Sequence, residues 1–262
     1  MRLVEPKVKL ISKPQIEWAN VERYLEEIGG LDWYDRVKEQ PSPDGEDLSE
    51  FAGRLCYRSW KPELNPNVTR VRENSAEYLQ NVVNVMHGSV FEHANYSFIL
   101  QDVSRVVTHE WVRHRAGCAY SQESLRFVRL SDLNMWFPEW AQADKELMDR
   151  SLKLLEDMEG HQKWMAEHFG LDDEGVPFSE KKAKTSFMRR MAPDGVATAM
   201  VWTANIRSIR HILEMRTAEG AEEEIRLVAD QVGQVMLEEA PAVFGDYTIT
   251  ESGAWVPGSR KI

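Results

Sequence analysis

The segment from Val112 to Leu130 constrains this chain more than any other part of its sequence. It reads V-R-H-R-A-G-C-A-Y-S-Q-E-S-L-R-F-V-R-L, so that two arginines flank a histidine near its start. Between Arg105 and Arg129, five arginines stand against two glutamates, although the whole chain has a net charge of −11. Because a local cationic field concentrates small anions whatever the overall charge, this segment predicts an anion-binding site.

The residues before this segment have the spacing of a helix. Four apolar positions follow the i, i+3, i+4, i+8 pattern of one buried face, namely Val103, Val106, Val107 and Trp111. Successive residues on a helix are about 100° apart, so Arg113 and Arg115 can meet one ligand only if the helix unwinds near them. Ala116-Gly117 is a suitable stop. The alternative is that Arg-His-Arg only complements the helix dipole.

The composition indicates a protein of the reduced cytoplasm without a membrane or nucleic-acid partner. The 262 residues are 42% hydrophobic, and no apolar run approaches the roughly 20 residues that span a bilayer. The first residues lack the apolar core of a signal peptide. Cys56 and Cys118 are the only cysteines and make no disulfide framework. Nucleic-acid-binding domains carry a basic stripe much larger than one cationic segment.

Hydrophobic periodicity predicts an α+β fold, with a small, mainly antiparallel sheet flanked by long helices. We expect one domain over residues 1–262 with an insertion-like, turn-rich loop at 33–46, because too little chain precedes it for an independent core. The predicted strands are Lys7–Ser12, Asn95–Gln101 and Leu125–Leu130. The predicted helices include Glu17–Ile28, Asp47–Tyr57, Ser75–Met86 and a long or broken helix over Glu139–Phe169, which Gly160 could interrupt.

A second cationic cluster lies on a predicted helix that follows Trp202. On a helical wheel, Asn205 and Arg216 fall within an apolar stripe formed by isoleucines and a leucine. The opposite side carries Arg207, Arg210, His211 and Glu214. A buried guanidinium needs acceptors, so Arg216 predicts either a ligand contact or an internal salt bridge, for instance to Glu222 or Glu223.

Three motifs together resemble the flavin-dependent thymidylate synthases. The first is Arg113-His114-Arg115 followed by Tyr-Ser-Gln-x-Ser-x-Arg-aromatic, here Tyr120 to Phe127. The second, His87 to His93, is similar to the family's His-x-Thr-x-Phe-Glu-His, with Ser89 in place of threonine. The third is Asn-x-Arg-Ser, a histidine and Leu-x-x-Arg between Asn205 and Arg216. The eight residues between Arg115 and Ser124 are one more than is usual in that family.

The resemblance assigns roles to particular residues. Those expected to bind FAD are His87, Ser89, Glu92, Arg113, His114, Arg115, Asn205, Arg207 and His211. Those expected to bind the nucleotide are Glu110, Arg113, Gln122, Glu123, Ser124, Arg126, Arg189 and Arg216. Arg216 is the expected catalytic residue, because it matches the arginine that holds the base for reaction. His87 and His93 lack the i, i+4 spacing of a zinc pair, so we expect no metal.

The reaction that the resemblance implies is the reductive methylation of dUMP at C5 to dTMP. Methylenetetrahydrofolate would give the carbon, FAD would carry reducing equivalents, and NADPH would reduce the flavin. The family also implies a homotetramer with active sites built from several chains. Two alternatives stay open. The first is a related methylase acting on UMP or another pyrimidine nucleotide; its motivation is Glu110, where the family commonly has a glutamine, and the extra residue between Arg115 and Ser124. The second is a flavin- or nucleotide-binding protein without methyl transfer.

Overall fold

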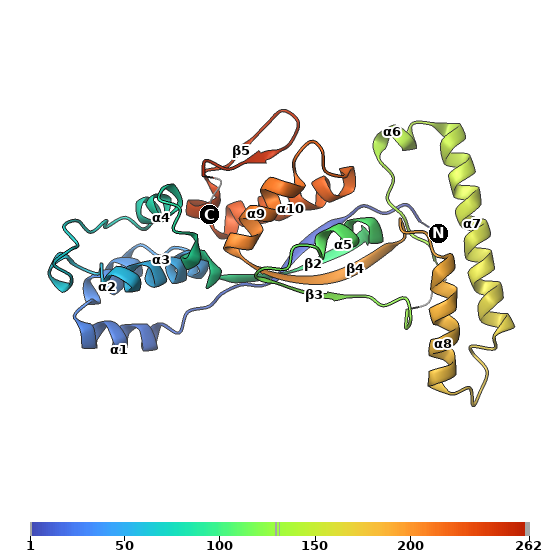
Figure 1. Ribbon diagram of the computed structural model, residues 1–262, viewed down its shortest axis with the longest axis horizontal. Coiled ribbons are helices and arrows are strands. Elements are labelled where there is room, and N and C mark those ends of the chain that lie inside the picture. Colours follow the sequence, from blue (N-terminus) through green and yellow to red (C-terminus); the bar gives the residue numbers. More distant parts are fainter. Residues whose placement is uncertain (1, 129, 131, 260–262) are drawn as a thin grey trace.

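The centre of the protein is a four-stranded antiparallel sheet, as the computed structural model of residues 2–128, 130 and 132–259 describes it. The strand order is β1-β2-β4-β3 (Figure 1). The strands are β1 Lys7–Ser12, β2 Asn95–Ser104, β3 Cys118–Gln122 and β4 Ala197–Asn205. A small separate hairpin joins β5 Thr248–Ile249 to β6 Trp255–Val256. The predicted α+β class and the antiparallel sheet are confirmed.

One face of the sheet carries the main core. In β2 the side chains of Tyr96, Phe98 and Leu100 are buried, as the alternation predicted. Phe98 pairs with Trp202 of β4, and their rings stack with centroids 5.4 Å apart. Helices α5, α9 and α10 lie over this face (Figure 1). They span Arg105–Trp111, Ile206–Arg216 and Glu223–Glu239.

Further helices extend this core at the end of the sheet where β2 begins. Helix α4 covers Ser75–Asn84, and the short helix α11 covers Pro241–Phe244. Each contributes buried apolar side chains, such as Leu79 and Phe244, to the same cluster. Between α4 and β2, residues Gly88–Glu92 form the 3-10 helix η2, which contacts α9. The predicted turn before β2 therefore has a fixed place beside α9.

The N-terminal helices form an aromatic cluster of their own, and here the loop prediction is wrong. Helix α1 spans Trp18–Ile28, α2 spans Leu31–Glu39, and α3 begins at Asp44 and ends at Tyr57. Most of 33–46 is therefore helical. The reason is that Trp33 and Val37 stand one helical turn apart and bury the same face of α2 against Trp60. A loop from Trp60 to Val71, with the 3-10 helix η1 at Pro62–Leu64, closes this cluster.

Two long helices stand at the opposite end of the sheet from α1–α4 (Figure 1). Helix α7 spans Lys145–His168 and α8 spans Phe178–Met188, with the short α6 at Glu139–Gln142 before them. The predicted break at Gly160 does not occur. Outside the backbone of α7 itself, no atom lies within 4 Å of the position that a Cβ of Gly160 would occupy. No neighbouring element therefore packs against the helix at this glycine.

The third predicted strand is also wrong. Residues 125–128 form a turn, in which the N–H groups of Phe127 and Val128 both donate to the carbonyl of Ser124. Phe127 and Val128 are exposed, so the apolar run does not mark a strand buried on the sheet. The strand lies earlier, at β3, where Tyr120 pairs with Trp202. Arg129, at the end of the predicted strand, lies outside the described residues.

None of the helices described in residues 2–128, 130 and 132–259 is long and apolar enough to cross a lipid bilayer.

Candidate active site

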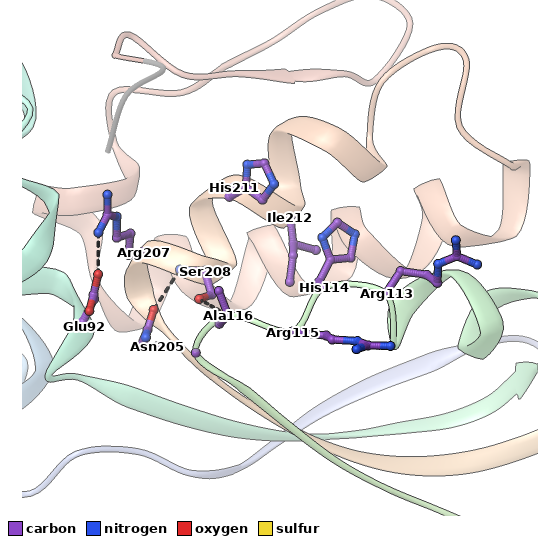
Figure 2. A pocket seen from close by; sticks show the side chains of 11 residues that line it. Glu92, Arg113, His114, Arg115, Ala116, Asn205, Arg207, Ser208, His211 and Ile212 are labelled. Atoms are coloured by element: carbon purple, nitrogen blue, oxygen red, sulfur yellow. Dashed lines mark hydrogen bonds and ion pairs between the residues drawn. The ribbon is translucent and has the colours of Figure 1, made fainter.

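A cavity of about 510 Å³ lies between the loop after α5 and the first turns of α9. Figure 2 shows side chains from three separate segments of the chain around it. The loop supplies two arginines and a histidine, α9 supplies a further arginine and a histidine, and η2 supplies a carboxylate. The predicted flavin-binding residues that line it are Glu92, Arg113, His114, Arg115, Asn205, Arg207 and His211.

The loop after α5 has the non-helical conformation that Arg113 and Arg115 need in order to reach one ligand. Helix α5 ends at Trp111, so Arg113 and Arg115 lie beyond the last helical turn. Gly117 has φ of 67°, a left-handed conformation that favours glycine. A Cβ at this position would also overlap the side chains of Asn205 and Ser208. The glycine therefore lets the loop pack directly on the start of α9.

Hydrogen bonds hold the loop on α9. The Ser208 Oγ donates to the carbonyl of Ala116 over 2.6 Å, and the Asn205 N–H donates to the carbonyl of Gly117 over 3.2 Å. The Asn205 side chain is the N-cap of α9, since its Oδ1 accepts from the N–H of Ser208. The buried side chain of Asn205 thus has a structural role, and only its Nδ2 remains to donate to a ligand.

The charges of the cavity favour an anion. Arg113, Arg115 and Arg207 stand against one carboxylate, Glu92, which forms an ion pair with Arg207 (Figure 2). Guanidinium groups bind phosphate oxygens through charge-assisted hydrogen bonds. A cavity with three guanidinium groups and one carboxylate is suited to a ligand with more than one negative charge. Among the described residues, no three His, Cys, Asp or Glu side chains are placed to hold a metal ion.

A hydrogen-bonded cluster around Arg216 adjoins the cavity. The Nε of Arg216 donates to Nε2 of His114 over 2.7 Å. Its Nη1 donates to Oε2 of Glu110 over 2.6 Å, and its Nη2 to the carbonyl of Glu110 over 3.3 Å. Arg216 therefore does have an internal carboxylate partner, but that partner is Glu110. Glu222 instead caps α10, and Glu223 accepts from Trp140.

The electrostatics of this cluster keep His114 neutral. Burial, followed by the neighbouring charges of Arg216 and His211, lowers the pKa of His114 to about 4. The rings of His114 and His211 face each other with centroids 5.9 Å apart. Because the neutral Nε2 accepts from Arg216, the ring proton lies on Nδ1. A guanidinium has five N–H donors, so two of those in Arg216 remain for a ligand.

The helical wheel placed Arg210 wrongly. It predicted Arg210 on the side of α9 away from the apolar stripe, yet the side chain is 2% exposed. Arg210 forms a bidentate ion pair with Asp246, with Nη1 and Nη2 at 2.7 and 2.8 Å from the two carboxylate oxygens. The segment after α11 covers this side of α9, and a wheel of one helix contains no information about such a segment.

The predicted substrate residues at the end of β3 and in the loop after it have partners within the protein. Gln122 donates to the hydroxyl of Thr108 over 3.0 Å. The carboxylate of Glu123 accepts from the N–H of Ala199 and so ties the loop to β4. Ser124 accepts from the N–H of Arg126, whose guanidinium lies 5.9 Å from the ring of Phe127. None of these four residues lines the first cavity.

Two predicted flavin residues lie outside that cavity. His87 borders a different cleft, where its ring makes an edge contact with Tyr57 at 5.7 Å. Ser89 is exposed on η2. Both stand on the same short segment as Glu92, which does line the cavity.

Arg189 lines a second cavity of about 290 Å³, together with Arg105 and Arg190. Sequence reasoning gave Arg105 no role, although it belongs to the cationic segment by composition. The signal that could have identified it is the lack of a carboxylate partner further along its own helix, where Thr108 and His109 stand three and four positions after Arg105.

Comparison with known proteins points to one family. Residues 38–242 match the family model described as thymidylate synthase complementing protein. A flavin-dependent thymidylate synthase of Mycolicibacterium gilvum is 36% identical over 218 residues, which cover 79% of this chain and 81% of that protein. Proteins of the same name from Mycobacteroides abscessus and Corynebacterium efficiens are 36% and 35% identical over 207 residues, covering 78% of this chain and 80% of each relative.

Proposed function

Because this chain belongs to the flavin-dependent thymidylate synthase family, we propose that it converts dUMP to dTMP by reductive methylation at C5. The observation that carries the proposal is the cationic first cavity beside Arg216, a guanidinium with two free donors. The proposed co-substrates are methylenetetrahydrofolate and NADPH, and the proposed cofactor is FAD.

The residues of the first cavity fit a flavin dinucleotide. Arg113, Arg115 and Arg207 would hold its diphosphate, while His211 and the Nδ2 of Asn205 offer further polar contacts. Gly117, where a Cβ would collide with Asn205 and Ser208, lets the loop that carries Arg113 and Arg115 pack closely on α9 beside the cavity. When bound, the flavin supplies the hydride that reduces the transferred carbon, and the protein supplies position and electrostatics.

The proposed reaction balances with one proton from solvent. The methylene carbon of the folate forms a bond to C5 of the uracil ring, and its bonds to the two folate nitrogens N5 and N10 break. The hydrogen on C5 leaves as a proton, and the two folate nitrogens take up one proton each. Reduction of the methylene carbon to a methyl group takes one hydride, which originates from NADPH. The products are dTMP, tetrahydrofolate and NADP⁺.

Arg216 suits the step at which negative charge builds on the uracil ring. Its two remaining N–H groups can donate to an acceptor on the uracil ring from a fixed, planar guanidinium. Preorganised donors of this kind stabilise charge that develops in a transition state. His114 and Glu110 hold the other three donors, so the fork need not reorganise during the reaction. Glu110 and Arg113 complete the proposed base-binding group.

The placement of the substrate residues supports an active site shared between chains. Arg113 lines the first cavity, and the ion pair of Arg216 with Glu110 adjoins this cavity through His114. Arg189 lines the second cavity with Leu125, beyond the end of β3, and the two cavities share no lining residue. We propose a homotetramer in which one chain holds the base and a neighbour holds the phosphate.

The sheet offers a surface for such a neighbour. The side chains of β2 and β4 that point away from the core include the half-buried Ile99 and Thr203 and the exposed Val201. Helices α5, α9 and α10 all lie on the opposite face (Figure 1).

The first test is the visible spectrum of the purified protein, followed by turnover. We expect flavin absorbance that NADPH bleaches, and formation of dTMP from dUMP when methylenetetrahydrofolate is added. UMP assayed side by side tests the alternative substrate. Retained flavin without methylation of either nucleotide would favour a flavin-binding protein of another activity and contradict the proposal.

A further inference from the structure

A cavity of about 390 Å³, the α2–α4 cavity, lies between the last turns of α2 and the start of α4. Its lining residues come from α2, from the loop between α2 and α3, and from the first turn of α4 with the two residues before it. None of them lines the first or the second cavity. The volume is in the range of sites for small organic ligands, and an inference about it does not rest on the proposed function.

The guanidinium of Arg36 faces this cavity without a partner. Its Nε and Nη2 atoms are buried, and neither makes a hydrogen bond within residues 2–128, 130 and 132–259. Asp32 stands four positions earlier on α2, at the usual spacing of a helical ion pair, but the two side chains form no such pair. Because a buried cation without an acceptor is costly, the fold holds Arg36 where an anion would stabilise it.

The two nitrogen atoms specify what kind of anion Arg36 can accept. Nε and Nη2 lie on one edge of the guanidinium, so their N–H groups are parallel. A carboxylate accepts such a pair of hydrogen bonds through its two oxygens, and this bidentate geometry is one that a lysine cannot reproduce.

The start of α4 supplies further donors to the cavity. Asn74 caps this helix, because its Oδ1 accepts from the N–H of Glu77 over 2.9 Å. The N–H groups of Ser75 and Ala76, the first two helical residues, make no hydrogen bond to any residue that the structure describes. Free N–H groups at a helix N-terminus favour an anion, so they act in the same direction as Arg36.

The remaining lining residues favour a carboxylate on an apolar body over a phosphate. Trp33 and Val37 are buried and give the cavity an apolar wall on α2. Glu73 is exposed and is the one carboxylate among the described lining residues. With a single guanidinium and a single carboxylate, the cavity has too little positive charge to favour a dianion.

We propose that the α2–α4 cavity binds the carboxylate of a small organic acid. Nε and Nη2 of Arg36 donate to the carboxylate, the N–H groups of Ser75 and Ala76 supply further donors, and Trp33 contacts the apolar body. None of these residues belongs to the three motifs of the family. Arg36 and Trp33 also precede residues 38–242, so the guanidinium on which the site depends lies outside the part that the family model matches.

Binding of benzoate, phenyl phosphate and benzyl alcohol to the purified holoenzyme tests the proposal. The three probes share an aromatic ring and carry a carboxylate, a phosphate or a neutral hydroxyl group. Dissociation constants are measured by ligand-observed NMR with FAD and dUMP in excess, so that the probes compete less for the sites of the proposed function. The ionic strength is kept constant, because salt screens exposed charges.

Arg36→Met removes the guanidinium and keeps an unbranched side chain. We expect it to bind benzoate about 10- to 100-fold more weakly than the parent, as for lost hydrogen bonds to a charged group. Arg23→Met is the matched control, since Arg23 is exposed on α1 and bonds only to residues of that helix, and it should resemble the parent. Phenyl phosphate should bind the parent more weakly than benzoate does. Benzyl alcohol should not distinguish Arg36→Met from the parent.

Ser75→Pro tests the start of α4 without changing Arg36. Proline removes the N–H group at the first helical position, where it is well tolerated, and Asn74 before it already has the extended backbone that proline requires. We expect the affinity for benzoate to fall about tenfold, as for one lost hydrogen bond to a charged group. Ser75→Ala keeps the N–H group and should lose less affinity than Ser75→Pro.

Several results would overturn the site. One is the absence of benzoate binding to the parent, and another is equal benzoate affinity in the parent and Arg36→Met. An equal loss for benzyl alcohol would mean that Arg36 only shapes the cavity, and stronger Arg36-dependent binding of phenyl phosphate would contradict the carboxylate assignment. If Arg36→Met does not fold, Arg36→Lys and Ser75→Pro decide, because parent-like benzoate affinity in both refutes the proposed donors.

Discussion

Arg216 donates from its Nε to Nε2 of His114 over 2.7 Å, although the two residues are 102 positions apart in the chain. The bond requires a neutral imidazole, and the low pKa of His114 provides it. Glu110 takes two further donors of Arg216. The orientation of the proposed catalytic cation therefore depends on Glu110 at the end of α5 and on His114 in the loop that follows.

Arg216→Lys should reduce turnover without removing the flavin. Lysine keeps the positive charge but cannot donate to His114, to Glu110 and to a substrate carbonyl in one plane. Loss of a donor to developing charge typically costs roughly 10²–10³ in rate. The measurement is single-turnover oxidation of the reduced flavin with nucleotide and folate present. Parent-like turnover, or simple unfolding of the variant, would mean that Arg216 only stabilises the fold.

His114→Gln should change how stability depends on acid pH. The folded-state pKa of His114, about 4, lies below its ordinary value of 6.5. Between these values the unfolded chain takes up a proton that the folded protein does not, so stability is lost as the pH falls below about 6.5. Glutamine offers an acceptor to Arg216 and does not titrate.

Urea midpoints at pH 7.5 and pH 5.0 test this expectation. The parent should lose more stability than His114→Gln between these two pH values. His161→Gln is the control, because it removes a histidine at an exposed position of α7. An identical loss in parent and His114→Gln would contradict the assignment of a neutral, buried His114.

Glu46→Gln should stabilise the protein at alkaline pH. Burial raises the pKa of Glu46 to about 7, although its Oε1 accepts from the N–H of Ala242 over 2.6 Å. The pKa of the neighbouring Asp47 is also raised to about 7, again mainly by burial. For a raised carboxyl pKa the folded protein keeps a proton that the unfolded chain releases, so stability falls as the pH rises from about 4.5 to 7.

The variant removes the titrating carboxyl group of Glu46 and keeps a side-chain oxygen that can accept from the N–H of Ala242. We expect a higher melting temperature than that of the parent at pH 8 and little difference at pH 5. Glu156→Gln, at an exposed position of α7, should show no such pH-dependent difference. If Glu46→Gln is less stable than the parent at pH 8, the ionised carboxylate stabilises the folded protein, which contradicts a raised pKa of Glu46.

Arg113→Ala combined with Arg207→Ala should yield a folded protein without flavin. The two residues approach the first cavity from the loop and from α9, and removing both leaves Arg115 as the only arginine among the residues described around it. Glu92 also loses its ion-pair partner. Flavin content per chain, read from the visible spectrum with circular dichroism as the folding control, checks the outcome. Full flavin content in the double variant would refute the cofactor assignment.

Local patterns predicted the elements whose stability is mostly local. Period-two alternation identified β1 and β2, and helical spacing identified α1, α4 and the stripe of α9. Two short segments were predicted wrongly, for opposite reasons. Helix α2 is short and its apolar residues are few, whereas the apolar run after Ser124 reads like a strand but lies exposed in a turn. In both cases contacts with distant residues decide.

The sequence by itself determined the family, the cationic segment and the identity of most residues around the first cavity, because motifs preserve residue types and spacing. Only the tertiary structure decided which charges meet. The pairing of Arg216 with Glu110, of Arg210 with Asp246, and of Arg105 with Arg189 joins elements separated by 106, 36 and 84 residues in sequence. Such contacts follow from strand order and helix packing, and the spacing of residues within one segment contains no information about either.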